Sequence, residues 1–147
     1  MSARIRLHDE AGPAVLVEKV ATRNGHRMAI TSVPTGRTAR LDPLELECLT
    51  WQDSETFRRW AATISTVHDR GGSVPDDEGG DTLELANEFA TVLLHKVLVG
   101  RTEHLDVVAR KLGTRTRLDV TMLQGVAAQA PETFTELLAS PFGAGAG

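Results

Sequence analysis

Apolar and polar residues alternate along two neighbouring stretches in the first part of the chain. The segments 14–22, AVLVEKVAT, and 26–33, HRMAITSV, carry apolar side chains at alternating positions, which is the spacing of half-buried strands. Between them lies the dipeptide Asn24-Gly25, which favours a type I′ turn because both residues tolerate positive φ. The pattern predicts an antiparallel hairpin, followed after the turn PTGR by a short strand that ends at Leu41.

After this strand the apolar spacing becomes helical. Asp42 is a good N-cap, Pro43 suits the first helical position, and Glu45 stands where its carboxylate reaches back to the backbone of Asp42, a variant capping box. Asp53 caps a second predicted helix in the same way. The apolar residues form a broad face on the first helix, Leu44, Leu46, Cys48, Leu49 and Trp51, and one stripe on the second, Phe57, Trp60, Ala61 and Ile64.

The whole pattern occurs twice. Shifting the sequence by 77 residues aligns 14–61 with 91–138 without a gap, and removing one residue extends the match upstream to IRLHDE against LELANE. About a quarter of the aligned residues are identical, where ordinary composition would give roughly one in sixteen. The sequence therefore indicates an internal duplication. Identical pairs include Val15/Val92, Lys19/Lys96, Gly36/Gly113, Arg40/Arg117, Leu41/Leu118, Asp42/Asp119, Leu46/Leu123, Glu55/Glu132 and Phe57/Phe134.

Each copy predicts an α+β unit, an antiparallel β-meander of three or four strands followed by two short helices. A unit of about 65 residues buries only about 60% of its surface and is marginal alone. We therefore expect the two copies to pack around a shared interface with pseudo-two-fold symmetry, as a dimer within one chain. The alternative is two independent units on a flexible connection.

The predicted boundaries follow from composition. Residues 1–67 form the first repeat, 82–143 the second, and 144–147 a disordered tail. Between the repeats, residues 68–81, HDRGGSVPDDEGGD, are rich in glycine and aspartate and predict a flexible linker.

Composition narrows the classes of partner and compartment. The 147 residues carry a net charge of −4, and the 16 basic residues are scattered, so the sequence lacks the basic footprint of a nucleic-acid-binding protein. The single Cys48 excludes an intrachain disulfide, and residues 1–20 show no signal peptide. No apolar run approaches the roughly 18 residues that span a bilayer. We expect a cytoplasmic protein with no nucleic-acid or membrane partner.

A dense group of polar side chains lies in the segment 41–57, LDPLELECLTWQDSETF. Its carboxylates suggest a paired-carboxylate catalytic site, and together with Cys48 and His26 they suggest a metal site. The candidate carboxylates are Asp42, Glu45, Glu47 and Glu55.

The second copy favours a structural interpretation of this segment. It keeps Asp119 and Glu132 at the capping positions, but has Met122 and Gln124 in place of the other two carboxylates and Gly125 in place of the cysteine. The five histidines show no spacing typical of a metal site. We therefore expect no catalytic residues, no metal and no cofactor.

Some polar and aromatic residues remain as candidates for an interaction or ligand surface. The repeated lysines stand inside apolar strands and the repeated arginines precede the capping aspartates. One interpretation is that the lysines protect an exposed sheet edge and the arginines pair with nearby carboxylates. The other is an anion or partner site duplicated across the pseudo-two-fold axis. The candidate surface comprises Glu45, Glu47, Cys48, Trp51, Trp60, Lys19, Lys96, Arg40 and Arg117.

Several motifs resemble a known family. RNGHR, RLDPLELECLTWQDSETF, LANEFATV and ETFTELLASPFG are similar to segments of small actinobacterial proteins, mostly single copies of this repeat, that are commonly labelled dihydrodiol dehydrogenase. The resemblance covers nearly the whole chain apart from the linker. The family signature is split here, since the first copy has the turn and helix motif and the second has the NEFA and SPFG motifs. The resemblance implies an association with aromatic or lipid catabolism.

The residues favour a role without catalysis. A hydride-transferring dehydrogenase normally has a Gly-rich strand-to-helix turn, and short-chain enzymes use a catalytic tyrosine, whereas this chain has neither GxGxxG nor any tyrosine. We predict an accessory or protein-interaction module, such as a small partner subunit of an oxidising enzyme in aromatic or lipid catabolism. The alternatives are a hydrophobic-ligand-binding protein, with Trp51 and Trp60 as a wall at the repeat interface, and the NAD-dependent dehydrogenase of the family label. Further oligomerisation stays open.

Overall fold

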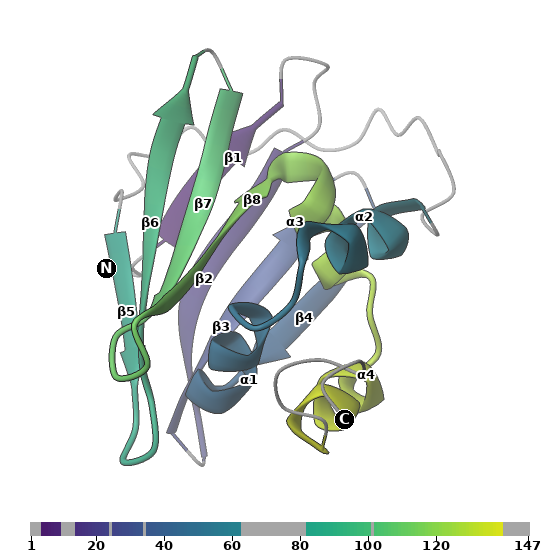
Figure 1. Cartoon of the computed structure of the whole chain (residues 1–147). Helices are drawn as coiled ribbons and strands as arrows, with labels where there is room; N and C mark the ends of the chain where they lie inside the picture. The colour runs from purple at the N-terminus through teal and green to yellow at the C-terminus, as the bar shows by residue number, and fades with distance from the viewer. Residues whose placement is uncertain are drawn as a thin grey trace.

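Two four-stranded antiparallel sheets and four short helices make up the fold (Figure 1). The structure is a computed structural model, and it describes residues 4–9, 14–23, 25–33, 35–62, 82–100 and 102–139. The predicted linker at 68–81 and the predicted tail at 144–147 lie outside these residues.

Each half of the chain builds one sheet and two helices. The first sheet has the order β1-β2-β3-β4 and the second β5-β6-β7-β8, so every strand pairs with its neighbour in sequence. This confirms the α+β class and the meander predicted for each repeat. The first repeat comprises β1 Arg4–His8, β2 Ala14–Thr22, β3 Gly25–Ser32, β4 Thr38–Leu41, α1 Pro43–Leu49 and α2 Ser54–Ala62. The second comprises β5 Thr82–Ala86, β6 Thr91–Val99, β7 Thr102–Ala109, β8 Thr114–Asp119, α3 Val120–Ala127 and α4 Pro131–Ala139.

The two repeats exchange their helices. α1 of the first repeat packs on β6 and β7 of the second sheet, and α3 of the second repeat packs on β2 and β3 of the first. The second helices follow the same rule, because α2 packs against α3 and α4 against α1. The four helices gather along one flank of the two sheets (Figure 1). This reciprocity is what a two-fold relation between the halves requires, and the alternative of two independent units is wrong.

One hydrophobic core is shared by both halves. The alternation along the strands turns one face of each sheet inward, so that residues such as Val17 and Ile30, which are paired across β2 and β3, are both buried. The inward faces and the apolar sides of the helices meet in a single cluster. Its members include Ile5, Leu7, Met28, Leu41, Leu46, Leu49 and Phe57 from the first repeat and Leu85, Leu94, Leu105, Leu118, Leu123, Val126 and Phe134 from the second.

The first hairpin differs from the prediction by one residue. Thr22 pairs with Gly25, so the connection consists of residues 23 and 24, not of Asn24 and Gly25. Gly25 is the first residue of β3 and has a φ of 111°, a conformation that L side chains rarely adopt. The glycine therefore serves the strand entry just after the turn, where its missing side chain makes the positive φ acceptable. In the second repeat, Val99 pairs with Thr102, and the positive φ falls on Gly100 inside the turn.

The repeated lysines lie on β2 and β6, one residue beyond the last described pairs with β1 and β5, which are Glu18 with Arg4 and His95 with Thr82. Their role as edge protection therefore stays a prediction. The Lys96 ammonium donates to the backbone carbonyl of Arg6 at 2.9 Å and pairs with Glu103 at 3.2 Å. The same carboxylate accepts the backbone N–H of His8 at 2.6 Å. Lys96 therefore joins β1 of the first sheet to the second sheet.

Candidate functional site

The carboxylates of the 41–57 segment act mainly at helix starts. The N–H of Glu45 donates to the Asp42 side chain at 2.7 Å, and the N–H of Asp42 donates to the Glu45 side chain at 2.9 Å, so the capping box is complete. Asp53 accepts from the backbone N–H of Thr56 at 3.0 Å at the start of α2. These bonds satisfy amide groups that the first turn of a helix leaves open. Asp42, Glu45 and Asp53 are thus committed to local structure.

Cys48 has the environment of an inert core residue. It is fully buried on α1. Burial raises the pKa of its thiol to about 12, and the neighbouring charges of Glu47, Asp42 and Glu45 add to this effect. A thiol with this pKa holds almost no thiolate at neutral pH, and the thiolate is the nucleophilic form. The structure gives Cys48 a packing role.

Glu47 is the one carboxylate of this segment that is nearly enclosed. It is 5% exposed, and burial raises the pKa of its carboxyl group, an effect that the positive charge of Lys111 partly offsets. Thr50, the C-cap residue of α1, contacts Thr114 of β8 through their hydroxyl groups at 2.7 Å. Glu47 and Thr50 therefore face the turn that joins β7 to β8, from which Lys111 comes.

The repeated arginines do not form a duplicated site. Arg117 makes a bidentate ion pair with the buried Asp106, with N–O distances of 2.7 and 3.0 Å, on the outward face of the second sheet. The hydrogen bonds from Arg117 lower the pKa of Asp106, with a smaller contribution from the charge of Arg115. Arg40, the matched residue in the first repeat, lies opposite Ala29, which occupies the position of the aspartate. Pairing with a carboxylate is confirmed for Arg117.

Trp60 belongs to the helix interface. Its ring lies edge-on between Phe57 and Phe134, with centroid distances of 5.7 and 6.1 Å. On the same interface, Gly125 of α3 approaches the backbone of α2 so closely that a Cβ atom would lie 2.7 Å from the nitrogen of Ala61. The aromatic contacts and the close backbone approach give Trp60 and Gly125 packing roles between the helices.

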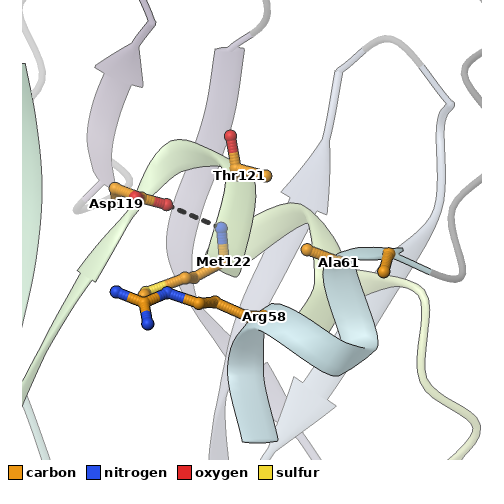
Figure 2. A pocket seen from close by; sticks show the side chains of 6 residues that line it. Arg58, Ala61, Asp119, Thr121 and Met122 are labelled. Atoms are coloured by element: carbon orange, nitrogen blue, oxygen red, sulfur yellow. Dashed lines mark hydrogen bonds between the residues drawn. The ribbon is translucent and has the colours of Figure 1, made fainter. Parts of the chain in front are cut away.

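A shallow groove of about 270 Å³ does lie between the repeats, at the junction of α2 and α3. Figure 2 shows Arg58 extending from α2 across Met122 toward Asp119, whose carboxylate accepts from the Met122 N–H at 2.8 Å. Neither tryptophan lines it. The groove is thus at the predicted repeat interface but lacks the predicted aromatic wall.

The predicted candidate residues are spread over the molecule. Glu47 and Cys48 are buried on α1, Trp60 lies between helices, and Arg40 and Arg117 stand on the outward faces of two different sheets. The structure brings no single surface together from these residues.

Exposed apolar side chains mark a surface that the sequence-based search missed. Phe89 is 63% exposed in the β5–β6 turn, and Leu112 is 47% exposed in the β7–β8 turn. Both turns lie at the same end of the second sheet, and Lys111 links them by donating to the carbonyl of Glu88 at 3.4 Å. We call this surface, Phe89, Leu112 and the adjoining Glu88 and Lys111, the apolar end. Its signal in the sequence is a large apolar residue, Leu112, at the position matched to Thr35 in the predicted turn PTGR.

The exposure is confined to one repeat. Within the described part of the chain, every exposed large hydrophobic side chain belongs to the second repeat, namely Phe89, Leu98, Val99 and Leu112. The positions matched to the last three are Ala21, Thr22 and Thr35, which are small or polar. Exposed large apolar side chains are therefore a feature of the second repeat that the described part of the first repeat does not share.

Across the described residues, no group of three or more His, Cys, Asp or Glu side chains is placed to hold a metal ion. No helix in the same residues has the length and apolarity needed to cross a bilayer. No protein-family model matches the chain, and a search of curated proteins returned no match.

Proposed function

We propose that this chain is a non-catalytic protein-interaction module that binds its partner through the apolar end of the second sheet. The observation that carries the proposal is the exposure of Phe89 and Leu112 on two adjacent turns. Adjacent exposed apolar side chains with polar neighbours are typical of protein interfaces, and a buried aromatic anchor often supplies much of the binding energy.

The turn that carries Phe89 is held in place before any partner binds. The Asn87 side chain accepts from the backbone N–H groups of Phe89 and Ala90, at 2.8 and 2.9 Å, and the Asn87 N–H donates to the Ala90 carbonyl at 2.9 Å. Such an ordered turn loses little conformational entropy on association. This local order supports recognition by Phe89 rather than incidental exposure.

The class of partner rests on the sequence resemblance. It points to an oxidising enzyme of aromatic or lipid catabolism, for which this chain would be a small accessory subunit. Two alternatives have weaker support. The groove at α2 and α3 is too small, and too open to solvent, to resemble the enclosed pockets in which hydrophobic ligands typically bind. Dinucleotides typically bind at the carboxyl ends of parallel strands, whereas all strand pairs among the described residues are antiparallel.

Affinity capture from a lysate of the source organism tests this function. The bait is the full chain, either wild type or the double variant Phe89→Ser/Leu112→Thr. The expected result is a stoichiometric partner with the wild type and at least a tenfold lower yield with the double variant. The matched control, Leu98→Ala/Val99→Thr, introduces first-repeat residues at the opposite end of the sheet and should retain the partner. Equal capture by both variants, or no stoichiometric partner at all, would refute the proposal.

A further inference from the structure

Glu47 lies on α1, which packs on β6 and β7, the two strands that adjoin the turns of the apolar end. Its counterpart in the second repeat, Gln124, donates to the hydroxyl of Ser32, the last residue of β3, at 3.4 Å. By the two-fold relation, Glu47 stands over the last residue of β7, Ala109, next to the turn that carries Lys111 and Leu112. The contact of Thr50 with Thr114 places the same side of α1 against this turn.

The carboxylate of Glu47 has unused capacity as an acceptor. Among the described residues, no side chain or backbone group donates a hydrogen bond to it, and no cation lies within 4 Å of it. Lys111 is close enough to affect its charge, but the Lys111 ammonium is directed to the carbonyl of Glu88. Among the described residues, the fully buried side-chain atoms without a partner do not include the Glu47 oxygens, so the carboxylate keeps a small opening to solvent through which a partner group can reach it.

The matched glutamine shows that a charge is not needed for the fold at this position. Gln124 has the same shape and occupies the equivalent place on α3 with a single hydrogen bond. The first repeat nevertheless carries a carboxylate here, and its α1 packs on β6 and β7, whose ends adjoin the turns that expose Phe89 and Leu112. The acidic group and the apolar side chains thus meet at one end of one sheet.

We propose that the partner segment bound at the apolar end places an apolar side chain on Phe89 and Leu112 and an adjacent lysine or arginine on the Glu47 carboxylate. This inference rests on the proposed function and specifies the chemistry of its ligand. A cation is the group that an incompletely bonded carboxylate selects, and a charge-assisted hydrogen bond in a largely dry site is strong and discriminating. A neutral or acidic segment would leave the carboxylate buried and unpaired.

Selection from a phage-displayed library of random peptides tests this specificity with the intact chain as bait. The expected winners carry a large apolar residue within a few positions of a lysine or arginine. A synthetic winning peptide should bind Glu47→Gln at least tenfold more weakly than wild type, as measured by fluorescence anisotropy. Glu55→Gln, which neutralises an exposed carboxylate on α2, outside the apolar end, is the matched control and should bind within about twofold of wild type.

Glu47→Gln copies the residue that the second repeat already accommodates, so it is expected to fold, and circular dichroism with thermal unfolding verifies this. Winners that lack basic residues, equal binding by Glu47→Gln, or a selection that returns no binding peptide would each overturn the inference. Loss of the lysate partner by Phe89→Ser/Leu112→Thr but not by Glu47→Gln would leave the proposed function standing and remove only the pairing with Glu47.

Discussion

The two helix crossings of this molecule occupy matched places but are built differently. At the α2–α3 crossing, Gly125 brings two backbones together, since any Cβ there would lie 2.7 Å from the nitrogen of Ala61. At the α1–α4 crossing, the matched residue is Cys48, whose side chain is fully buried. The two repeats thus share one topology, but the α2–α3 crossing depends on close approach of two backbones, whereas at the α1–α4 crossing a buried side chain lies between the helices.

The largest effect is expected from adding a methyl group at the close crossing. Gly125→Ala should lower the free energy of unfolding by about 2–3 kcal/mol, because the new Cβ meets backbone that cannot turn aside. Urea denaturation measures the change. The matched substitution in α1, Cys48→Ala, only removes a sulfur atom and should cost about 1 kcal/mol. Equal losses at the two positions would contradict the difference between the crossings.

The outward faces of the two sheets differ at one ion pair. Asp106→Ala gives the second sheet the residue found in the first, Ala29, and should cost about 1–2 kcal/mol at pH 7. The expected loss of stability is no larger because the Arg117 side chain is about half exposed, so that solvent screens the ion pair. Arg40→Ala, which removes the matched arginine of the first sheet, should change stability by less than about 0.5 kcal/mol.

The pH dependence of this loss has a defined sign. Arg117 lowers the pKa of Asp106 in the folded state, so the pair stabilises the protein above the ordinary aspartate pKa of 3.8. The stabilisation disappears as the pH falls through the lower folded value. Unfolding curves of wild type and Asp106→Ala should therefore converge below about pH 4. A constant gap down to pH 2 would show that the ion pair is not its source.

The two N-caps should respond alike despite their different surroundings. Asp42→Ala and Asp119→Ala each remove a side-chain acceptor from a helix start and should each cost about 1 kcal/mol, measured by urea denaturation. The asparagine variants keep an acceptor oxygen and should lose only a few tenths of a kcal/mol. If the alanine variant at either position behaved like wild type, that cap would have no stabilising role.

The smallest effect on stability is expected from Glu47→Gln, and it is a gain at neutral pH. Burial raises the pKa of Glu47 in the folded state, so its contribution is most favourable below the ordinary glutamate pKa of 4.5 and declines as the pH rises through the folded value. Thermal unfolding should show the variant to be more stable than wild type at pH 7, with the difference shrinking toward pH 4. A variant that is less stable at pH 7 would show that the charge is well accommodated in the free protein.

Local features were accessible from the sequence because they depend on neighbours along the chain. The capping box of Asp42 and Glu45, the buried Cys48 and the duplicated order of strands and helices follow from spacing alone. The register of the first hairpin was missed because Gly25 serves the strand entry rather than the turn.

The exchange of helices and the candidate surface were harder to predict. Both sheets present similar apolar faces, so the broad apolar face of α1 fits either one, and only the packing of the whole chain selects the second sheet. The same exchange encloses Glu47, which by its own sequence context reads as a surface residue. Phe89 lies within the NEFA motif, but its exposure depends on which parts of the molecule leave that turn uncovered.

The exchange of helices also constrains how this chain is made on the ribosome. α1 is synthesised long before β6 and β7, the strands it covers, and the first sheet waits for α3. Until residues near Ala109 and then Ala127 have emerged, neither the first sheet nor α1 has its proper cover. The nascent first half therefore holds apolar surface in contact with solvent, and a message truncated near the middle would yield a fragment prone to aggregation or dependent on chaperones.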